Sequence, residues 1–171
     1  MRKYLPFLLT AIVIALDQIS KAIIVAFVPE NTMWASFFGD YLEIIHVRNN
    51  AVAFSMGSGF PMILKIGLFI IVPLVFLAVL SYYLVKAKEE DVTTFQRWLM
   101  AGIVGGGLGN IIDRIFRGMS VVDFISTNNY GFLGMDRFPT YNIADASVVI
   151  CVILMVFTII FPSRVNKEKT K

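Results

Sequence analysis

Four long apolar segments divide the chain, at about residues 4–28, 62–85, 96–116 and 143–162. Each is long enough to cross a hydrocarbon core of about 30 Å as a helix, which takes roughly 20 residues. Backbone amides in lipid must be hydrogen-bonded within their own segment, so all four are predicted to be transmembrane helices. Pro73 lies inside the second segment, where a proline can kink a helix.

The segment between the first two helices has the pattern of a β-hairpin. Residues 41–47 are rich in strand-forming types, Asn49-Asn50 suits a tight turn, and residues 51–56 are apolar again. We therefore predict a hairpin over about 37–57. It carries too many apolar side chains for a fully solvated hairpin, and we expect it to lie on the membrane surface or against the helices.

The loop at about 117–142, between the third and fourth helices, has two recognisable parts. Residues 120–125 are a short strand candidate that carries Asp123. Residues 128–134 (NNYGFLG) have turn composition and are predicted to form a surface turn or a mobile lid. His46, on the hairpin, is expected at a surface or an interface rather than in catalysis. We find no internal repeat or linker, so residues 1–171 are predicted to form one domain.

Composition supports a membrane protein. The 171 residues are 57% hydrophobic and 16% charged, with a mean hydropathy of +0.75, which leaves too few polar residues to cover a soluble domain. The N-terminus imitates a signal peptide but lacks a small-residue cleavage site, so it is predicted to be retained as a helix. The single Cys151 cannot form an intramolecular disulfide and is expected to fill space.

Basic residues predict the orientation. On one side they lie before the first helix, between the second and third, and after the fourth: Arg2, Lys3, Lys86, Lys88, Arg97, Arg164, Lys167, Lys169 and Lys171. The opposite loops hold Arg48, Arg117 and Arg137, with Arg114 at a helix end. By the positive-inside rule both termini are cytoplasmic and the loops 29–61 and 117–142 face outward. Basic residues at helix ends rather than in one patch also argue against a nucleic-acid partner.

Two sets of residues within the predicted helices are explained by helix packing: a charged pair in the first helix and four glycines in the third. Asp17 and Lys21 are spaced i, i+4, share a helix face and are expected to form an ion pair that supports packing or a nearby site. Gly102, Gly105, Gly106 and Gly109 form overlapping GxxxG patterns, which let helices approach closely. No strand precedes these glycines and no Gly-Lys-Ser/Thr follows, so a phosphate-binding loop is excluded.

Further polar residues gather where the third and fourth helices meet the outer loop. Asn110 lies one turn deeper than Asp113 and Arg114, and its amide needs partners inside the bundle. An interfacial anchor is a sufficient explanation for Asp113 and Arg114.

Asp123 and Asp145 are the strongest candidates for chemistry. Two carboxylates brought together can share one proton, because like charges at close range cannot both ionise. The ionised partner can activate a water while the protonated partner polarises an amide carbonyl. Helix-capping or loop roles, and a divalent metal site completed by Asp113, are the alternatives.

Five motifs in order resemble bacterial lipoprotein signal peptidase, the signal peptidase II family, over essentially the full length. They are DQISK at 17–21, RNNAVAF at 48–54, GLGNIIDR at 107–114, VVDFI at 121–125 and FPTYNIAD at 138–145. The resemblance implies an aspartyl intramembrane protease of the bacterial cytoplasmic membrane, with four transmembrane helices and an extracytoplasmic β-cradle. It implies cleavage of diacylglyceryl-modified prolipoproteins just before the lipid-bearing cysteine, and inhibition by globomycin-type cyclic peptides.

The resemblance also assigns roles by position. Asp123 and Asp145 match the catalytic pair, near the outer face of the membrane. Asn49, Asn110, Arg114 and Asn142 match the shell that orients substrate and pair, and Asp17, Lys21 and Asp113 match structural support. No metal or other cofactor is implied, the expected partners besides substrate are membrane lipids, and nothing requires more than a monomer.

One motif departs from the family. The usual Asn-x-Gly-Ala-Ala-Phe has Ala51 in place of glycine and Val52 in place of alanine, which can change the local backbone.

The rival class is a non-enzymatic channel, transporter subunit or bundle scaffold that uses the acidic residues for ions or packing. A four-span transporter would be expected to place polar residues near the midplane, whereas these cluster at one face.

Overall fold

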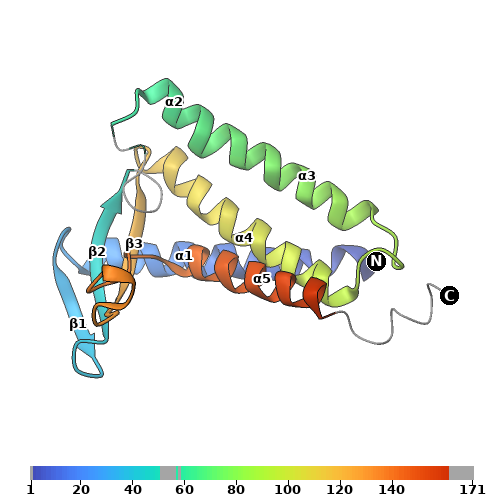
Figure 1. Ribbon diagram of the computed structural model, residues 1–171. Coiled ribbons are helices and arrows are strands. Elements are labelled where there is room, and N and C mark those ends of the chain that lie inside the picture. Colours follow the sequence, from blue (N-terminus) through green and yellow to red (C-terminus); the bar gives the residue numbers. More distant parts are fainter. Residues whose placement is uncertain (1, 51–56, 58, 162–171) are drawn as a thin grey trace.

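The computed structural model describes residues 2–50, 57 and 59–161. It contains helices long and apolar enough to cross a membrane at Phe7–Phe27 (α1), Met62–Lys86, Thr94–Phe116 (α4) and Ile143–Ile160 (α5). A three-stranded sheet lies across one end of the bundle, and the chain begins at the opposite end (Figure 1). The predicted fold class, a four-helix membrane bundle with a small β-sheet, is confirmed.

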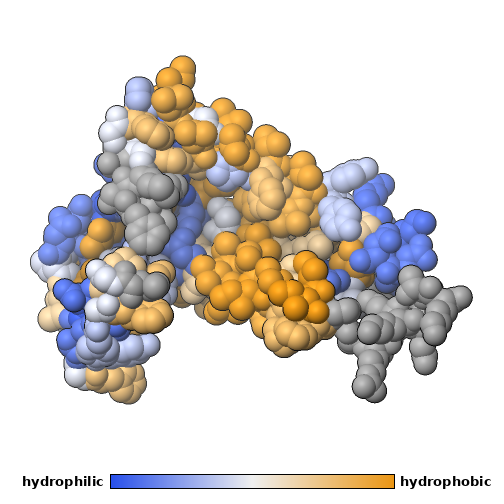
Figure 2. All heavy atoms as spheres, in the orientation of Figure 1, coloured by the Kyte–Doolittle hydropathy of each residue, from blue (hydrophilic) through white to orange (hydrophobic). Residues whose placement is uncertain are grey.

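Helix α4 is the centre of the bundle. In its apolar window 61% of residues are buried, against 11% in α5, so α4 is surrounded by protein while α5 faces outward. The apolar outer surface of the bundle is visible in Figure 2. A capping box starts α4: the Thr93 hydroxyl accepts from the amide of Gln96, whose side chain accepts from the amide of Thr93. Two orphan amides are thereby satisfied at the helix start.

The glycines of α4 let its neighbours approach, as the GxxxG patterns predicted. A Cβ at Gly105 would lie 2.9 Å from Cβ of Val13 on α1, and one at Gly106 would lie 2.7 Å from a methyl group of Val148 on α5. Both distances are too short for real contacts. The helix therefore contacts α1 and α5 through its backbone.

The second span is not a uniform α-helix. It consists of α2 (Met62–Ile66), a π-helical turn (η3, Gly67–Ile71) and α3 (Val72–Lys86), with the amide of Val72 donating to the carbonyl of Gly67. Pro73 follows immediately and has no amide hydrogen to give. The irregularity expected at Pro73 is thus a π turn, which changes the hydrogen-bond register ahead of the proline.

The sheet corrects the predicted hairpin. Strands β1 (Met33–Phe37) and β2 (Leu42–Asn49) form an antiparallel hairpin, and β3 (Val121–Thr127) pairs with the other edge of β2. The turn therefore lies at 38–41, where Gly39 has φ +75°, and Asn49 is the last residue of β2 rather than a turn residue. The predicted returning stretch 51–56, with Ala51 and Val52, lies outside the described residues.

A small apolar cluster attaches the sheet to α1. Ile24 and Val28 at the end of α1 pack against Val122 and Phe124 of β3. His46 of β2 is 3% exposed, and its Nδ1 lies 2.7 Å from the Val28 carbonyl oxygen. Of the two expected locations, a surface or an interface, the structure shows the interface. The imidazole of His46 joins the strand to the chain leaving α1.

Replacing Gly106 by Ala should destabilise the bundle. The added methyl group overlaps Val148, and overpacking of this kind typically costs about 1–3 kcal/mol. Thermal unfolding in detergent measures the effect. Gly67→Ala is the matched control, because a Cβ there has no neighbour within 4 Å. Equal melting temperatures for the two variants would contradict close packing at Gly106.

Candidate active site

The two candidate carboxylates come from different kinds of structure. Asp123 lies in β3, where its Cα pairs with Val47 of β2, and Asp145 lies in the first turn of α5. Asn142 is the N-cap of α5: its side-chain oxygen accepts from the amide of Asp145 at 3.0 Å, and the Asp145 carboxylate accepts from the amide of Asn142 at 3.2 Å. The capping role considered for Asp145 is therefore real, and it holds the carboxylate in place.

Asparagine side chains join the two carboxylates. Nδ2 of Asn142 donates to Asp123 at 2.7 Å and to Oδ1 of Asn110 at 3.1 Å. Asn110 in turn donates from Nδ2 to Asp145 at 2.7 Å. Asn49 donates to the other oxygen of Asp123 at 3.0 Å. The structure thus brings together Asp123, Asp145 and three of the four residues predicted to orient them.

The environment of Asp123 favours a proton on its carboxyl group. Burial first, and then the neighbouring charge of Asp145, raise the pKa of Asp123 to about 7. Hydrogen bonds from Asn49 and Asn142 act in the opposite direction, because they stabilise the ionised form. A buried carboxyl beside a second carboxylate, titrating near neutral pH, is suited to proton transfer.

Lys21, a buried lysine of α1, contacts this network from the bundle side. Nζ of Lys21 lies 2.8 Å from Asp17 and 3.0 Å from Asp113, and it donates to Asn110 at 3.0 Å. Lys21, Asp17 and Asp113 are all fully buried. The ion pair predicted from the i, i+4 spacing is present, and Asp113 belongs to it. Asp113 is therefore not the interfacial anchor considered from sequence.

Each of these supporting carboxylates also holds a backbone amide next to a candidate catalytic residue. Asp113 accepts from the amide of Val122 at 3.0 Å, and Asp17 accepts from the amide of Ala144 at 3.0 Å. Val122 precedes Asp123, and Ala144 precedes Asp145. The support cluster thereby sets the positions of both carboxylates through the main chain.

Sequence reasoning missed two members of this cluster. Nε2 of Gln18 lies 3.1 Å from Asp17 and 3.0 Å from Asp113, and Arg117 forms an ion pair with Asp113. Gln18 lies inside the DQISK motif, and Arg117 is spaced i, i+4 from Asp113. Both signals were available in the sequence.

Arg114 lies on the side of the site that faces the second span. Nη1 donates to the Asn110 carbonyl at 3.4 Å, and the guanidinium lies 5.7 Å from the ring centroid of Phe69 in the π turn. The positive charge of Arg114 interacts electrostatically with the carboxylates of Asp145 and Asp123. Arg114 is thus a cation close to the carboxylates.

The metal alternative does not match this geometry. Among the described residues no three His, Cys, Asp or Glu side chains converge as metal ligands. Asp113 binds Lys21, Arg117, Gln18 and the Val122 amide instead of joining Asp123 and Asp145.

Comparison with known proteins identifies the class. The family described as signal peptidase (SPase) II matches residues 9–161. The lipoprotein signal peptidase of Treponema denticola is 45% identical over 149 residues, covering 86% of this chain and 84% of the relative. That of Treponema pallidum is 39% identical over 160 residues, covering 92% and 84%.

Two solved structures described as bacterial membrane enzymes have the same fold. One has a TM-score of 0.78 at 32% identity, covering 93% of this chain and 89% of the other. The second has a TM-score of 0.75 at 29% identity, covering 92% and 94%. Fold and relatives together define a membrane-embedded protease. The chain belongs to the signal peptidase II family, which confirms the predicted family and excludes the channel or scaffold alternative.

Replacing Lys21 by Met should destabilise the protein strongly. Removing one partner from a buried ionic cluster typically costs about 3–5 kcal/mol, because uncompensated charge stays buried. Thermal unfolding in detergent measures the loss. Lys88→Met is the control, since Lys88 and Glu90 form an exposed pair with side chains 76% and 67% accessible, whose loss should change stability by less than about 0.5 kcal/mol. Similar losses in both variants would contradict a central role for Lys21.

Proposed function

We propose that Asp123 and Asp145 are the catalytic pair of this peptidase and hold one proton between them. The ionised carboxylate would take a proton from a water as it attacks the scissile carbonyl. The protonated one would donate its proton to the carbonyl oxygen. The observation that carries the proposal is Asn142, which donates to Asp123 while exchanging two hydrogen bonds with Asp145.

As a member of the signal peptidase II family, the chain removes signal peptides from lipoproteins. The finer assignment of substrate is part of the proposal: a prolipoprotein already carrying a diacylglyceryl group, cut just before the lipid-modified cysteine. Such a substrate presents its cleavage site where its acyl chains enter the bilayer. Asp145 in the first turn of a spanning helix and Asp123 on a strand beside it lie at that kind of boundary.

The surrounding residues receive separate roles. Asn49, Asn110 and Asn142 orient the two carboxylates through the hydrogen bonds described above, and Arg114 helps to orient the substrate. Asp17, Lys21 and Asp113 position the backbone without touching substrate. Globomycin-type cyclic peptides are proposed to occupy the same site, and the protein is proposed to act as a monomer among membrane lipids.

The orientation follows from the charge distribution. We place both termini in the cytoplasm and the sheet on the outer face of the bacterial cytoplasmic membrane. In Figure 1 the N-terminus lies at the end of the bundle opposite the sheet, as this arrangement requires.

Asp123→Asn and Asp145→Asn should each abolish processing, with a loss of at least about a thousandfold, because neither amide can exchange the required proton. A gel-shift assay with a diacylglyceryl-modified precursor measures cleavage. Asp136→Asn is the control, because Asp136 is an exposed residue of the outer loop, whereas Asp123 is buried. If either dyad variant still cleaves at the rate of the Asp136 variant, the assignment is wrong.

The rate should depend on the protonation of Asp123. With its pKa raised to about 7, Asp123 keeps its proton below that pH, so activity should fall as pH rises through 7. Asn49→Ala removes a hydrogen bond that stabilises the ionised form, and the alkaline limb should therefore move to higher pH.

Initial rates between pH 5 and 9 test this prediction. Asn129→Ala serves as the control, because the hydrogen bonds found for Asn129 come from its backbone. If the alkaline limb of the pH–rate profile does not move in Asn49→Ala, or moves equally in the control, then the pKa of Asp123 does not determine that limb.

A further inference from the structure

Two turns at one end of the sheet expose aromatic side chains. Phe37 and Phe38 come from the end of β1 and the β1–β2 turn, and Tyr130 and Phe132 come from the loop that follows β3; we call these four residues the tip patch. Phe38 is 82% exposed, Phe132 71% and Tyr130 68%. Clustered exposed aromatic rings on a protein surface indicate a binding surface.

Polar contacts make the two turns one unit. The Asp40 carboxylate accepts from Asn128 at 2.7 Å and from the Tyr130 hydroxyl at 3.2 Å. Arg137 donates to the Asp40 carbonyl at 2.7 Å and forms an ion pair with Glu43 of β2 at 2.5 Å. The 128–137 loop is therefore fastened to the hairpin, and the tip patch is carried by β2. The free lid predicted at 128–134 stays an untested prediction.

The backbone conformation of Phe38 and Tyr130 is a second indication that these aromatic side chains have a functional role. Phe38 has φ +55° and Tyr130 has φ +51°, in the left-handed region that glycine and asparagine adopt most readily. Bulky aromatic residues are unfavourable there. Local folding alone would favour other residue types at both positions.

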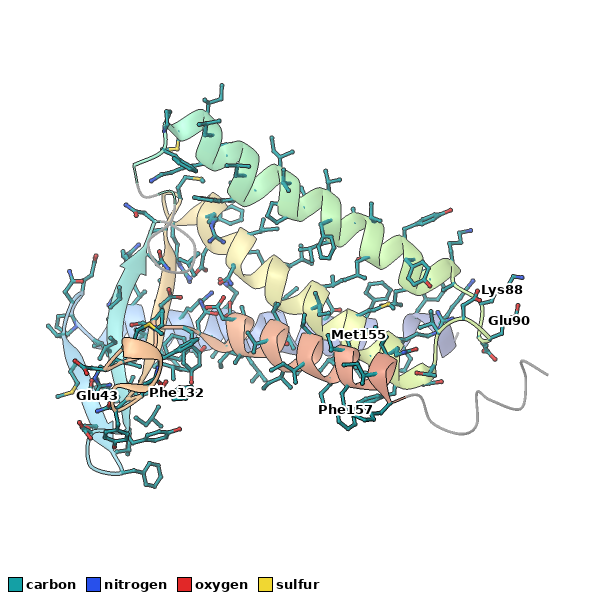
Figure 3. The ribbon with its side chains drawn as sticks, in the orientation of Figure 1. Glu43, Lys88, Glu90, Phe132, Met155 and Phe157 are labelled. Atoms are coloured by element: carbon teal, nitrogen blue, oxygen red, sulfur yellow. The ribbon has the colours of Figure 1, made fainter. Side chains whose placement is uncertain are left out.

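The place of the tip patch indicates its partner. The sheet crosses the end of the bundle, and its β1–β2 turn extends sideways beyond α5 (Figure 1), with apolar residues at its end (Figure 2). In Figure 3 the side chain of Phe132 likewise lies on the sheet side, away from Met155 and Phe157 of α5. The outer surface of α5 is apolar and largely exposed in the structure, so in a membrane the overhanging turn would lie over the lipid that surrounds α5. Tyr and Trp concentrate at this depth in membrane proteins, and Tyr130 is the residue of the tip patch that fits this rule; the three phenylalanines add apolar area.

The charged residues around the tip patch argue against a purely electrostatic contact with lipid headgroups. The groups next to the tip patch are Asp40, Glu43 and Asp136, with Arg137 as the nearby cation. An acidic surrounding does not attract anionic headgroups. Contact with the membrane would instead come from burial of the aromatic rings, and it should be insensitive to salt and to lipid charge.

We propose that the tip patch inserts into the headgroup layer of the leaflet on the sheet side and holds the sheet at a fixed depth. Strand β2 transmits this depth to the site: from Leu42 to Val47 it spans about 17 Å, and Val47 pairs with Asp123. The consequence for catalysis rests on the proposed dyad, whereas the insertion does not.

Nitroxide labels test insertion on the full-length chain in phosphatidylcholine nanodiscs. In a Cys151→Ala background, single labels are placed at Phe38 and Phe132. Glu89, exposed in the loop between α3 and α4, is the water reference, and Val156, 47% exposed on α5, is the lipid reference. Labels at Phe38 and Phe132 should prefer oxygen over a water-soluble nickel complex, as Val156 does. They should keep that preference when a third of the lipid is phosphatidylglycerol.

Accessibility equal to that of Glu89 at both labels would overturn the proposal. So would dipolar coupling between labels on separate chains, because a second copy would then cover the patch. This readout needs no peptidase activity, so its failure is distinct from failure of the dyad assignment.

Substitution tests the effect on processing. Phe38→Asn with Phe132→Ser removes two rings, and asparagine suits the left-handed backbone at position 38. We expect processing in bilayers to fall several-fold, and Phe38→Trp with Phe132→Trp to keep the normal rate. An unchanged rate in the Asn/Ser variant would show that the tip patch does not set the depth of the site.

Discussion

The rest of the site depends on the buried ion pairs that Lys21 forms with Asp17 and Asp113. An isolated charge inside an apolar bundle is strongly unfavourable, and here it is compensated by Asp17 and Asp113, with Arg117 paired to Asp113 from the edge. The same two carboxylates also accept the amides of Ala144 and Val122. One cation therefore fixes the start of a membrane helix and the start of an extramembrane strand relative to each other.

Neutral amides of Asn49, Asn110 and Asn142 make direct contacts with the proposed catalytic pair. Asn110 accepts from Lys21 through its oxygen, so its nitrogen must point toward Asp145. A lysine bonded directly to Asp123 would favour the ionised carboxylate and lower its pKa. With amides in between, the carboxyl groups are held in place by the charged cluster, while Asp123 keeps a pKa of about 7. Positioning and proton affinity are thus set by different residues.

The parts of the protein that sequence predicted are those with short-range signals. Helix spans follow from apolar length, the Asp17–Lys21 pair from i, i+4 spacing, and the contacts of α4 from its glycines. Asp123 and Asp145 are candidates for a pair because both lie where the chain meets the membrane, but 22 positions separate them and no local rule joins a strand to a helix start. Only the family resemblance favours the pair over capping, loop or metal roles.

Predictions failed where a local signal competed with tertiary contacts. Asn49-Asn50 has turn composition, yet β3 pairs along β2 as far as Asn49, and the hairpin turns at Phe38 and Gly39 instead. A phenylalanine with positive φ is a poor turn signal, so sequence statistics could not find it. For His46 the sequence leaves a surface and an interface open, and only the tertiary contact with the Val28 carbonyl shows which of the two applies.

The site combines a residue from a strand with a residue from a helix, and this limits how far the sheet can move relative to the bundle. Asp145 moves with α5, whose depth is fixed by its apolar length, whereas Asp123 moves with a sheet that no spanning segment contains. The amide–carboxylate bonds through Asn142 tolerate little change in distance, so the sheet must keep a constant depth relative to the bundle. The Lys21 cluster sets this relation at the bundle end of β3, through the amide of Val122. At the far end of β2 the proposed contact of the exposed aromatic rings with the bilayer would perform the same task.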